Sequence, residues 1–536
     1  MNKISKIYYL LLGVLILNMV SCKPEMDLNN PKEISVSTYY TTVDQLKASI
    51  IPAYEALIGK NQGTYARCFY IELLTEGDDF DGTFKWQPLY QDTYNTPASD
   101  GMVLSSWKDL WNGVYAANVA IDAITNFKGT ITESLKNQLL GEAYFLRGIH
   151  YLHLCSIYGE TIPLIQIPIK SNADYYPTNS KAGEIYALII SDFQKAVGYL
   201  PTKSALYKET TNIGRATKGA AQGYLAKAYM YRPILEIGQK AEFAKAEAEL
   251  KNLVDSKEYS LVANFRSNSL DLNENNSESV FELQFVNGPS WMGGDYSDSW
   301  RWQEVGMVDG TGGSWWNLAP NQKTLKEFEA GDPRKYMTLW CEGGAKYTDL
   351  LGNVVDYTNW MAHLASDKDL LGTRKYCRDY QVGDIDNDIN ERLMRYADVL
   401  LMYAECLNED GKGTEAKTYI NMVRSRANNV VPTEQTQLWY QNSPGTIPDV
   451  DGLLASNITI NGIPMNSIKN IIQHERYVEL CGEYVRYFDL IRWGMADAQW
   501  LKPLQDIAWT KKAMYFPIPQ QELDNNPNLK GNDMNK

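Results

Sequence analysis

The chain has 536 residues, of which 44% are hydrophobic and 12% aromatic, and this composition excludes an intrinsically disordered protein. A chain of this length is expected to form one large domain or two fused domains. The formal net charge is −14 and no basic stripe stands out, so nucleic acid is not expected as a partner.

The first residues are typical of a targeting segment. Lys3 and Lys6 form a basic head, and the apolar run Tyr8–Val20 is too short for a membrane span, which needs about 20 residues. Cys22 stands where cleavage of a signal peptide is expected, and a cysteine there resembles the lipobox of bacterial lipoproteins. We therefore predict removal of residues 1–21 and acylation of Cys22; an ordinary secretory signal with a coincidental cysteine is the alternative.

Two helices are predicted between Trp107 and Tyr158, with a break near 128–132. In the second helix, apolar residues recur every three or four positions and form one buried face. His150 falls within that face, so we expect a hydrogen-bonded core histidine there and not a metal ligand. Gly159 is expected to end the helix.

Two further helix pairs are predicted, at 214–232 with 243–253 and at 396–407 with 416–427. The first pair carries Gly219 and Gly223, which allow close approach of a neighbour. Such hairpins are the unit of tetratricopeptide repeats, although their irregular spacing here favours degenerate repeats interrupted by insertions. The fold class is therefore mostly α, with loop-rich insertions and a few short strands, one of them at 280–285.

Three regions are predicted to be inserted loops, near 60–100, 286–320 and 431–465. The first two are rich in Gly, Asp, Tyr and Trp, and the third is rich in proline and polar residues. The interval 286–320 carries many aromatic residues: Trp291, Tyr296, Trp300, Trp302, Trp315 and Trp316. Tryptophan can cover the flat face of a sugar ring, so this composition favours carbohydrate binding, with packing in a core as the alternative.

The sequence ELLTEGDDFDG (72–82) crowds carboxylates that a glycosidase could use in pairs. Such a cluster is more often solvated, turn-forming or ion-binding, and no GxSxG, HExxH or phosphate loop accompanies it. The run DIDNDIN (384–390) lacks the later ligands of an EF-hand, where Arg395 takes the place of the last one, but a looser structural calcium site stays open. Beyond Cys22, six cysteines show no CxxC pair, and no disulfide can be selected from their spacing.

Eight segments in order resemble the SusD/RagB outer-membrane lipoproteins of Bacteroidetes. They are GEAYFLRGIHYLHLCSIYGETIPLI at 141, GRATKGAAQGYLAKAY at 214, NENNSESVFELQF at 273, GDPRKYMTL at 331, LMRYADVLLMYAECLNEDG at 393, INMVRSRANN at 420, HERYVELCGEYVRYFDLIRWG at 474 and YFPIPQQELDNNPNL at 515. The resemblance reaches from the lipid cysteine almost to the end of the chain. Residues 22–536 are therefore expected to form a single helical domain of this kind, anchored to the outer membrane and facing the cell exterior.

The resemblance also implies a function. Such proteins bind a nutrient and pass it to a SusC-like TonB-dependent transporter without catalysis; glycans are the commonest ligands, and some members serve peptide uptake. We expect a glycan ligand, with a peptide ligand or, less favoured, glycoside hydrolysis as alternatives. Transferred by position, the stacking candidates are Trp86, Tyr90 or Tyr94 in the first insertion and Trp291, Tyr296, Trp315 or Trp316 in the second, and all but Tyr90 are kept as ligand-binding candidates. We add Asp78, Asp79 and Asn95 as candidates for polar contacts.

Nine charged residues in the matching segments are expected to be structural. They alternate in sign on helices that must pack together, which predicts partly buried ion pairs. They are Arg147, Arg395, Asp398, Glu405, Arg424, Glu475, Arg486, Asp489 and Arg492.

Overall fold

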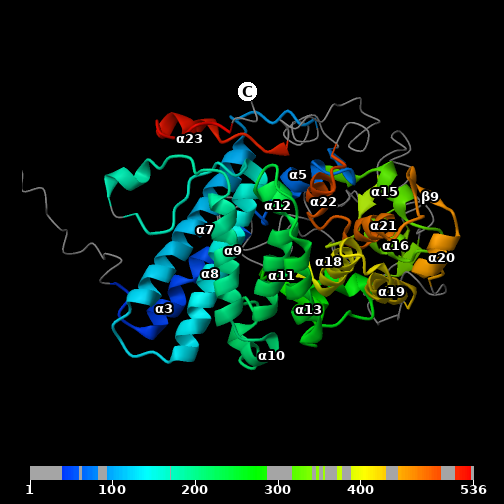
Figure 1. Ribbon diagram of the computed structural model, residues 1–536, viewed down its shortest axis with the longest axis horizontal. Coiled ribbons are helices and arrows are strands. Elements are labelled where there is room, and N and C mark those ends of the chain that lie inside the picture. Colours follow the sequence, from blue (N-terminus) through cyan, green and yellow to red (C-terminus); the bar gives the residue numbers. More distant parts are fainter. Residues whose placement is uncertain are drawn as a thin grey trace, which may run out of the picture.

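The computed structural model describes residues 39–59, 63–82, 93–169, 171–286, 317–340, 346–348, 354–356, 371–376, 388–429, 445–496 and 514–532. Within them the chain is mostly helical, as predicted, with short strands paired two by two (Figure 1). The predicted signal peptide, Cys22 and most of the insertion 286–320 lie outside the described residues.

The helices are α3 (Val43–Ser49), α4 (Ile51–Ile58), α5 (Cys68–Thr75), α7 (Gly101–Asn126), α8 (Glu133–Tyr158), α9 (Glu184–Tyr199), α10 (Lys203–Leu206), α11 (Lys218–Met230), α12 (Arg232–Leu235), α13 (Phe243–Asp255), α15 (Gln322–Glu327), α16 (Arg334–Thr338), α18 (Tyr396–Glu409), α19 (Gly413–Asn428), α20 (Val450–Ala455), α21 (Ile468–Leu480), α22 (Arg486–Arg492) and α23 (Gln520–Asn525). Short 3-10 helices are η1 (Asn172–Tyr175), η2 (Thr210–Asn212), η3 (Phe265–Ser269) and η4 (Asp271–Asn273). The strands are β1 (Phe80–Gly82), β2 (Ser279–Leu283), β3 (Leu318–Pro320), β4 (Leu339–Trp340), β5 (Lys346–Thr348), β6 (Val354–Asp356), β7 (Gly372–Thr373), β8 (Glu391–Arg395), β9 (Thr459–Ile460) and β10 (Ile463–Pro464). The antiparallel pairs are β1–β3, β2–β8, β4–β7, β5–β6 and β9–β10.

The longer helices form a continuous row. Each of α7, α8, α9, α11, α13, α18 and α19 packs on the next, and Figure 1 shows them crossing the molecule in that order. Helix α21 packs on α18 and α19 at the far end, and α22 packs on α5 and α12. The predicted hairpins α7–α8, α11–α13 and α18–α19 are all confirmed, and the row they build is the scaffold on which the insertions lie.

Helices α7 and α8 begin and end where the sequence predicts. The Asp100 carboxylate accepts hydrogen bonds from the first turn of α7, and the Thr132 hydroxyl does so for α8. At the end of α8, Gly159 has a φ of 88° and its N–H donates to the carbonyl of Cys155. The His150 ring is buried, and its Nε2 lies 2.9 Å from the Ala53 carbonyl, which confirms the core role.

Helix α11 is buried along almost its whole length. A Cβ on Gly219 would collide with the Tyr259 ring, and one on Gly223 would collide with the Met394 sulfur. The small residues therefore admit side chains of neighbouring segments as well as the close approach of α13, the neighbour that the sequence predicts.

All three predicted loop regions contain regular structure. Helix α5 and strand β1 lie within 60–100, β3 lies at the end of 286–320, and α20, β9 and β10 lie within 431–465. Helix α5 is too short to show a clear period of apolar residues, and α20 carries a single turn of buried apolar side chains after the Asp449 cap. Such short elements form because the rest of the fold covers their apolar side.

Candidate functional site

Two of the predicted insertions meet at their bases. Strand β1 pairs with β3 in an antiparallel register, with Phe80 opposite Pro320 and Gly82 opposite Leu318. The Asp79 carbonyl extends this contact, since it accepts hydrogen bonds from residues 321 and 324 at 3.1 and 2.7 Å. The chain therefore leaves β1 and enters β3 at the same end of the ribbon.

The stacking candidates lie close to this junction in sequence. Trp86 follows Gly82 by four residues, and Trp316 precedes Leu318 by two. Trp86, Trp291, Tyr296, Trp315 and Trp316 all lie outside the described residues, so their part in ligand binding stays a prediction.

Asp78 is buried and fully engaged in ion pairs. Its two oxygens accept hydrogen bonds from Arg486 at 2.6 and 2.9 Å, and Lys323 donates to one of them. Burial alone would raise the pKa of this carboxyl, but Arg486 and Lys323 hold it well below its usual range. In this position Asp78, which lies just before β1, ties the first insertion to α22 and α15, which is a structural role.

Asp79 is also buried, and one of its carboxylate oxygens accepts a hydrogen bond, at 3.4 Å, from the N–H of Gly482 in the segment just after α21. Burial and the neighbouring charge of Asp78 raise the pKa of Asp79 to about 7. Glu72 and Glu76 are likewise buried. The expectation that the cluster is solvated is thus wrong for these four side chains, whereas residues 76–79 do form a turn and bends. The reason is that partners distant in sequence, among them Ser106 at Glu72 and Arg486 at Asp78, cover them.

Tyr94 and Asn95 lie on the segment that leads from the first insertion to α7. The Tyr94 ring is half-buried, and its hydroxyl donates to the Glu76 carbonyl at 3.2 Å. Its φ of 54° is in the left-handed region, which directs the chain sharply at this point. The Asn95 side chain is exposed and is available to a ligand, unlike the buried Asp78 and Asp79.

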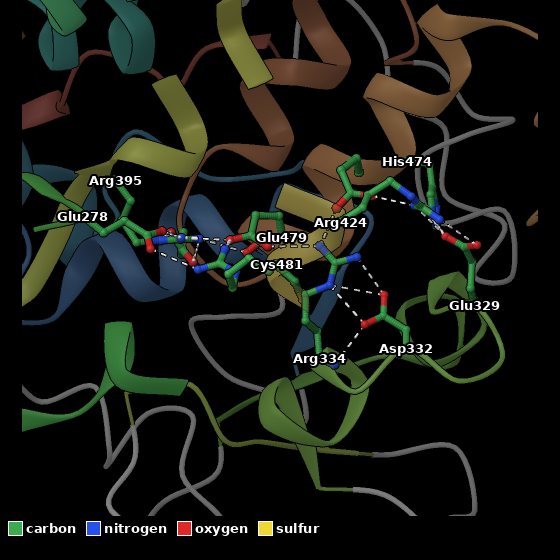
Figure 2. A network of polar contacts seen from close by, with 12 residues as sticks. Glu278, Glu329, Asp332, Arg334, Arg395, Arg424, His474, Glu479 and Cys481 are labelled. Carbon is green, nitrogen blue, oxygen red and sulfur yellow. Dashed lines mark hydrogen bonds and ion pairs between the residues drawn. The ribbon is translucent and has the colours of Figure 1, made fainter. Parts of the chain in front are cut away.

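A network of buried ion pairs surrounds α21 (Figure 2), the helix whose Tyr477 hydroxyl donates to the Asp78 carbonyl next to β1. Arg395 binds Glu278 and Glu479 at 2.6 and 2.9 Å at one end of the view. Arg334 binds Asp332 at 2.8 Å and Glu479 at 3.0 Å in the middle. These side chains come from the residue before β2, from β8, from α16 and the segment just before it, and from α21, so the network joins segments that are far apart in the sequence.

The other end of the network holds α15 and the segment after it against α21. His474 lies between two carboxylates, with Nδ1 2.9 Å from Glu327 and Nε2 3.1 Å from Glu329. Burial would lower the pKa of this imidazole, but the hydrogen bonds to Glu327 and Glu329 raise it to about 9. Arg424 binds Glu329 and Glu475, each at 2.8 Å.

All nine charged residues that were predicted to be structural form ion pairs. Besides those above, Arg147 binds Asp192, Arg476 binds Asp398 and Asp489, and Arg492 binds Glu405. The sequence did not single out Glu278, Arg334, Arg476 or Glu479. One pattern in the sequence indicates buried charges of this kind. Charged side chains recur every four residues, at 475, 479 and 483, within and just after a largely buried helix.

Among the described residues, no group of His, Cys, Asp and Glu is arranged to hold a metal ion. Asp384 and Asp386 of the calcium candidate lie outside them, so that site stays a prediction. None of the helices in the described ranges combines the length and apolarity that a membrane span requires. The cysteines at 68, 155, 406 and 481 are buried free thiols.

Two family models match this chain. One is described as the SusD family and matches residues 256–534; the other is described as starch-binding associating with outer membrane and matches residues 23–230. The SusD-like protein P2 of Formosa agariphila is 27% identical, over 98% of this chain and 99% of its own.

Solved structures share the fold. A SusD superfamily protein from Bacteroides vulgatus gives a TM-score of 0.74 at 23% identity, over 93% of this chain and all of that one. Surface glycan-binding protein A from Bacteroides fluxus gives a TM-score of 0.69 at 22% identity, over 92% of this chain and 99% of that one.

Proposed function

The chain belongs to the SusD family, and we propose from this premise that it binds an oligosaccharide or polysaccharide without cleaving it. One matching family model is named for starch binding at the outer membrane, and the relative from Bacteroides fluxus is named a surface glycan-binding protein. Neither name identifies the sugar that this chain binds.

The observation that carries the proposal is the β1–β3 junction. It joins the bases of two insertions that are rich in aromatic residues, and ion pairs fix both to one helical frame. A rigid base lowers the entropy cost of ligand binding, because the supporting strands are already in place. Trp86 and Asn95 from one insertion and Trp291, Tyr296, Trp315 and Trp316 from the other are the proposed contacts.

We further propose that Cys22 is acylated and holds the protein on the outside of the outer membrane. There it would deliver its glycan to a SusC-like TonB-dependent transporter. The support is the lipobox-like junction at residues 21–22 and the resemblance over the whole chain.

The alternatives differ in ligand and in chemistry. A peptide would be held largely through its main chain, whereas exposed aromatic rings suit sugars better. A hydrolase needs accessible carboxylates at a suitable separation. Glu72 and Asp79 have raised pKa values, as a general acid requires, but both are buried.

A binding screen tests the proposal. The form lacking residues 1–22 is offered arrayed glycans and a matched peptide library, and the bound glycan is then incubated with the protein and analysed for products. We expect glycan binding without product. Exclusive peptide binding supports the alternative uptake role, and turnover that is lost in a Glu72→Gln variant supports hydrolysis.

A further inference from the structure

A cleft of about 610 Å³ lies between α7, the segment 163–177 and α23. Its volume is in the range of small-ligand sites. None of the described residues that line it belongs to the predicted ligand face.

The rim of the cleft gathers exposed aromatic rings. Tyr115 is 43% exposed, Tyr175 62% and Tyr176 48%, and they make up three of the five exposed tyrosines among the described residues. Scattered apolar side chains are normal on a surface, but a cluster of them marks a binding site. The rings come from two separate walls, since Tyr115 is on α7 whereas Tyr175 and Tyr176 are at the end of η1.

The deeper part of the cleft is built from Trp107 and Trp111. Trp107 is buried and Trp111 is half-buried, and their ring centroids are 5.7 Å apart. Trp111 also packs edge-on against Tyr151, at 5.8 Å. Its indole N–H is buried and has no acceptor among the described residues. An unpaired buried donor costs about 1–3 kcal/mol, which a ligand oxygen could offset.

Polar side chains surround these rings. Asn112 on α7 and Asn525 on α23 are exposed and face the cleft from opposite walls. Side-chain amides donate and accept hydrogen bonds, as the hydroxyls of a sugar require. The rim carries a net negative charge, because it holds Asp174 and Glu522 but, of the described basic residues, only Lys108. An anionic ligand would therefore be repelled.

We propose that this cleft is a second carbohydrate site, which takes an uncharged oligosaccharide. The aromatic rings can cover the faces of the sugar, the side-chain amides can bind its hydroxyls, and the negative rim disfavours an anionic ligand. A bound peptide would need main-chain partners such as a strand edge, and no strand of the described residues contributes to the lining. The inference rests on the proposed function, because it adds a site to the same activity.

The test uses the form lacking residues 1–22 on an array of uncharged and anionic oligosaccharides. Its variants are Tyr175→Ala with Tyr176→Ala, and separately Asn525→Ala on the opposite wall. The control is Tyr199→Ala, which removes a tyrosine that is 39% exposed but lies outside the cleft. We expect the wild type to bind an uncharged oligosaccharide at two sites and both cleft variants to bind more weakly at one of them. The affinity at that site should fall about tenfold for the tyrosine pair, and the melting temperature should stay unchanged.

The outcomes distinguish failure of the proposed function from failure of the second site alone. If the wild-type chain binds no glycan on the array, the proposed function fails and the cleft site with it. If it binds, but both cleft variants bind as Tyr199→Ala does, only the second site is refuted. Binding of anionic glycans that is lost in the cleft variants would refute the uncharged class.

Discussion

Asp78 and Arg486 form a buried ion pair, in which the carboxylate is 1% exposed. Replacing Asp78 with Asn would leave the Arg486 charge buried with its partner neutralised. Removing one member of a buried pair costs about 3–5 kcal/mol. We therefore predict that D78N lowers the free energy of unfolding by that order, as measured by urea denaturation of the form lacking residues 1–22.

A suitable control is Asp44→Asn, because the Asp44 side chain is 94% exposed and lies 3.8 Å from Lys47. Exposed pairs contribute little, so this variant should unfold like the wild type. The structural role of Asp78 would be contradicted if D78N kept its stability but lost glycan binding.

For individual residues, the sequence predicted which charged side chains are structural but did not predict their partners. Alternation of sign on packed helices marks Arg424 and Glu475, which do pair. The pairing of Asp78 with Arg486 joins positions that are 408 residues apart, and nothing local encodes it. That is why the acidic run 72–82 resembles a solvated loop in the sequence and is largely buried in the structure.

Helix α21 is coupled to α15 and the segment after it through His474. Because Glu327 and Glu329 raise the pKa of His474 from 6.5 to about 9, the folded state binds this proton more tightly than the unfolded chain does. The stabilisation is complete below pH 6.5 and is lost as the pH rises through 9. The contribution is about 3 kcal/mol.

The measurement is urea unfolding from pH 6 to 10 for the wild type and for His474→Gln. We expect the wild type to lose stability over that range and the variant to be less stable at pH 6 but to change less with pH. His150 serves as an internal contrast: burial lowers its pKa to about 4, so its effect on stability appears only as the pH falls below 6.5. Parallel curves for wild type and variant would show that His474 carries no extra charge in the folded state.

Among the elements, the long helices were predictable because their apolar period repeats over several turns. Helix α8 extends over 26 residues and ends at the predicted Gly159. Helices α5 and α20, with 8 and 6 residues, give no comparable signal. The β1–β3 pairing could not be predicted, because strands of three residues carry almost no pattern and their partners are distant.

For the whole molecule, the proposed acylation of Cys22 would determine where the protein resides. Each buried CH₂ contributes about 0.8 kcal/mol, so several acyl chains give an almost irreversible anchor. We predict that Cys22→Ala is released from the membrane fraction, whereas Cys68→Ala, a change at a buried thiol, stays with it. Equal retention of Cys22→Ala and wild type would refute the anchor.

The proposed transporter partnership predicts a stable complex, with two copies of each protein. Affinity purification of the tagged chain from gently solubilised outer membranes should recover a TonB-dependent transporter in equal amount. Recovery of the tagged chain alone, under conditions that preserve other membrane complexes, would count against the partnership.

The proposed ligand face consists of aromatic side chains from two insertions, joined at β1–β3, which bind glycan without supporting the fold. The measurement is the affinity for the glycan found in the binding screen, together with the melting temperature, for Trp86→Ala and Trp316→Ala. We predict an affinity loss of about tenfold or more for each variant, with the melting temperature nearly unchanged. Variants that unfold at a lower temperature but bind glycan as the wild type does would show that these rings belong to the core and would contradict the claim.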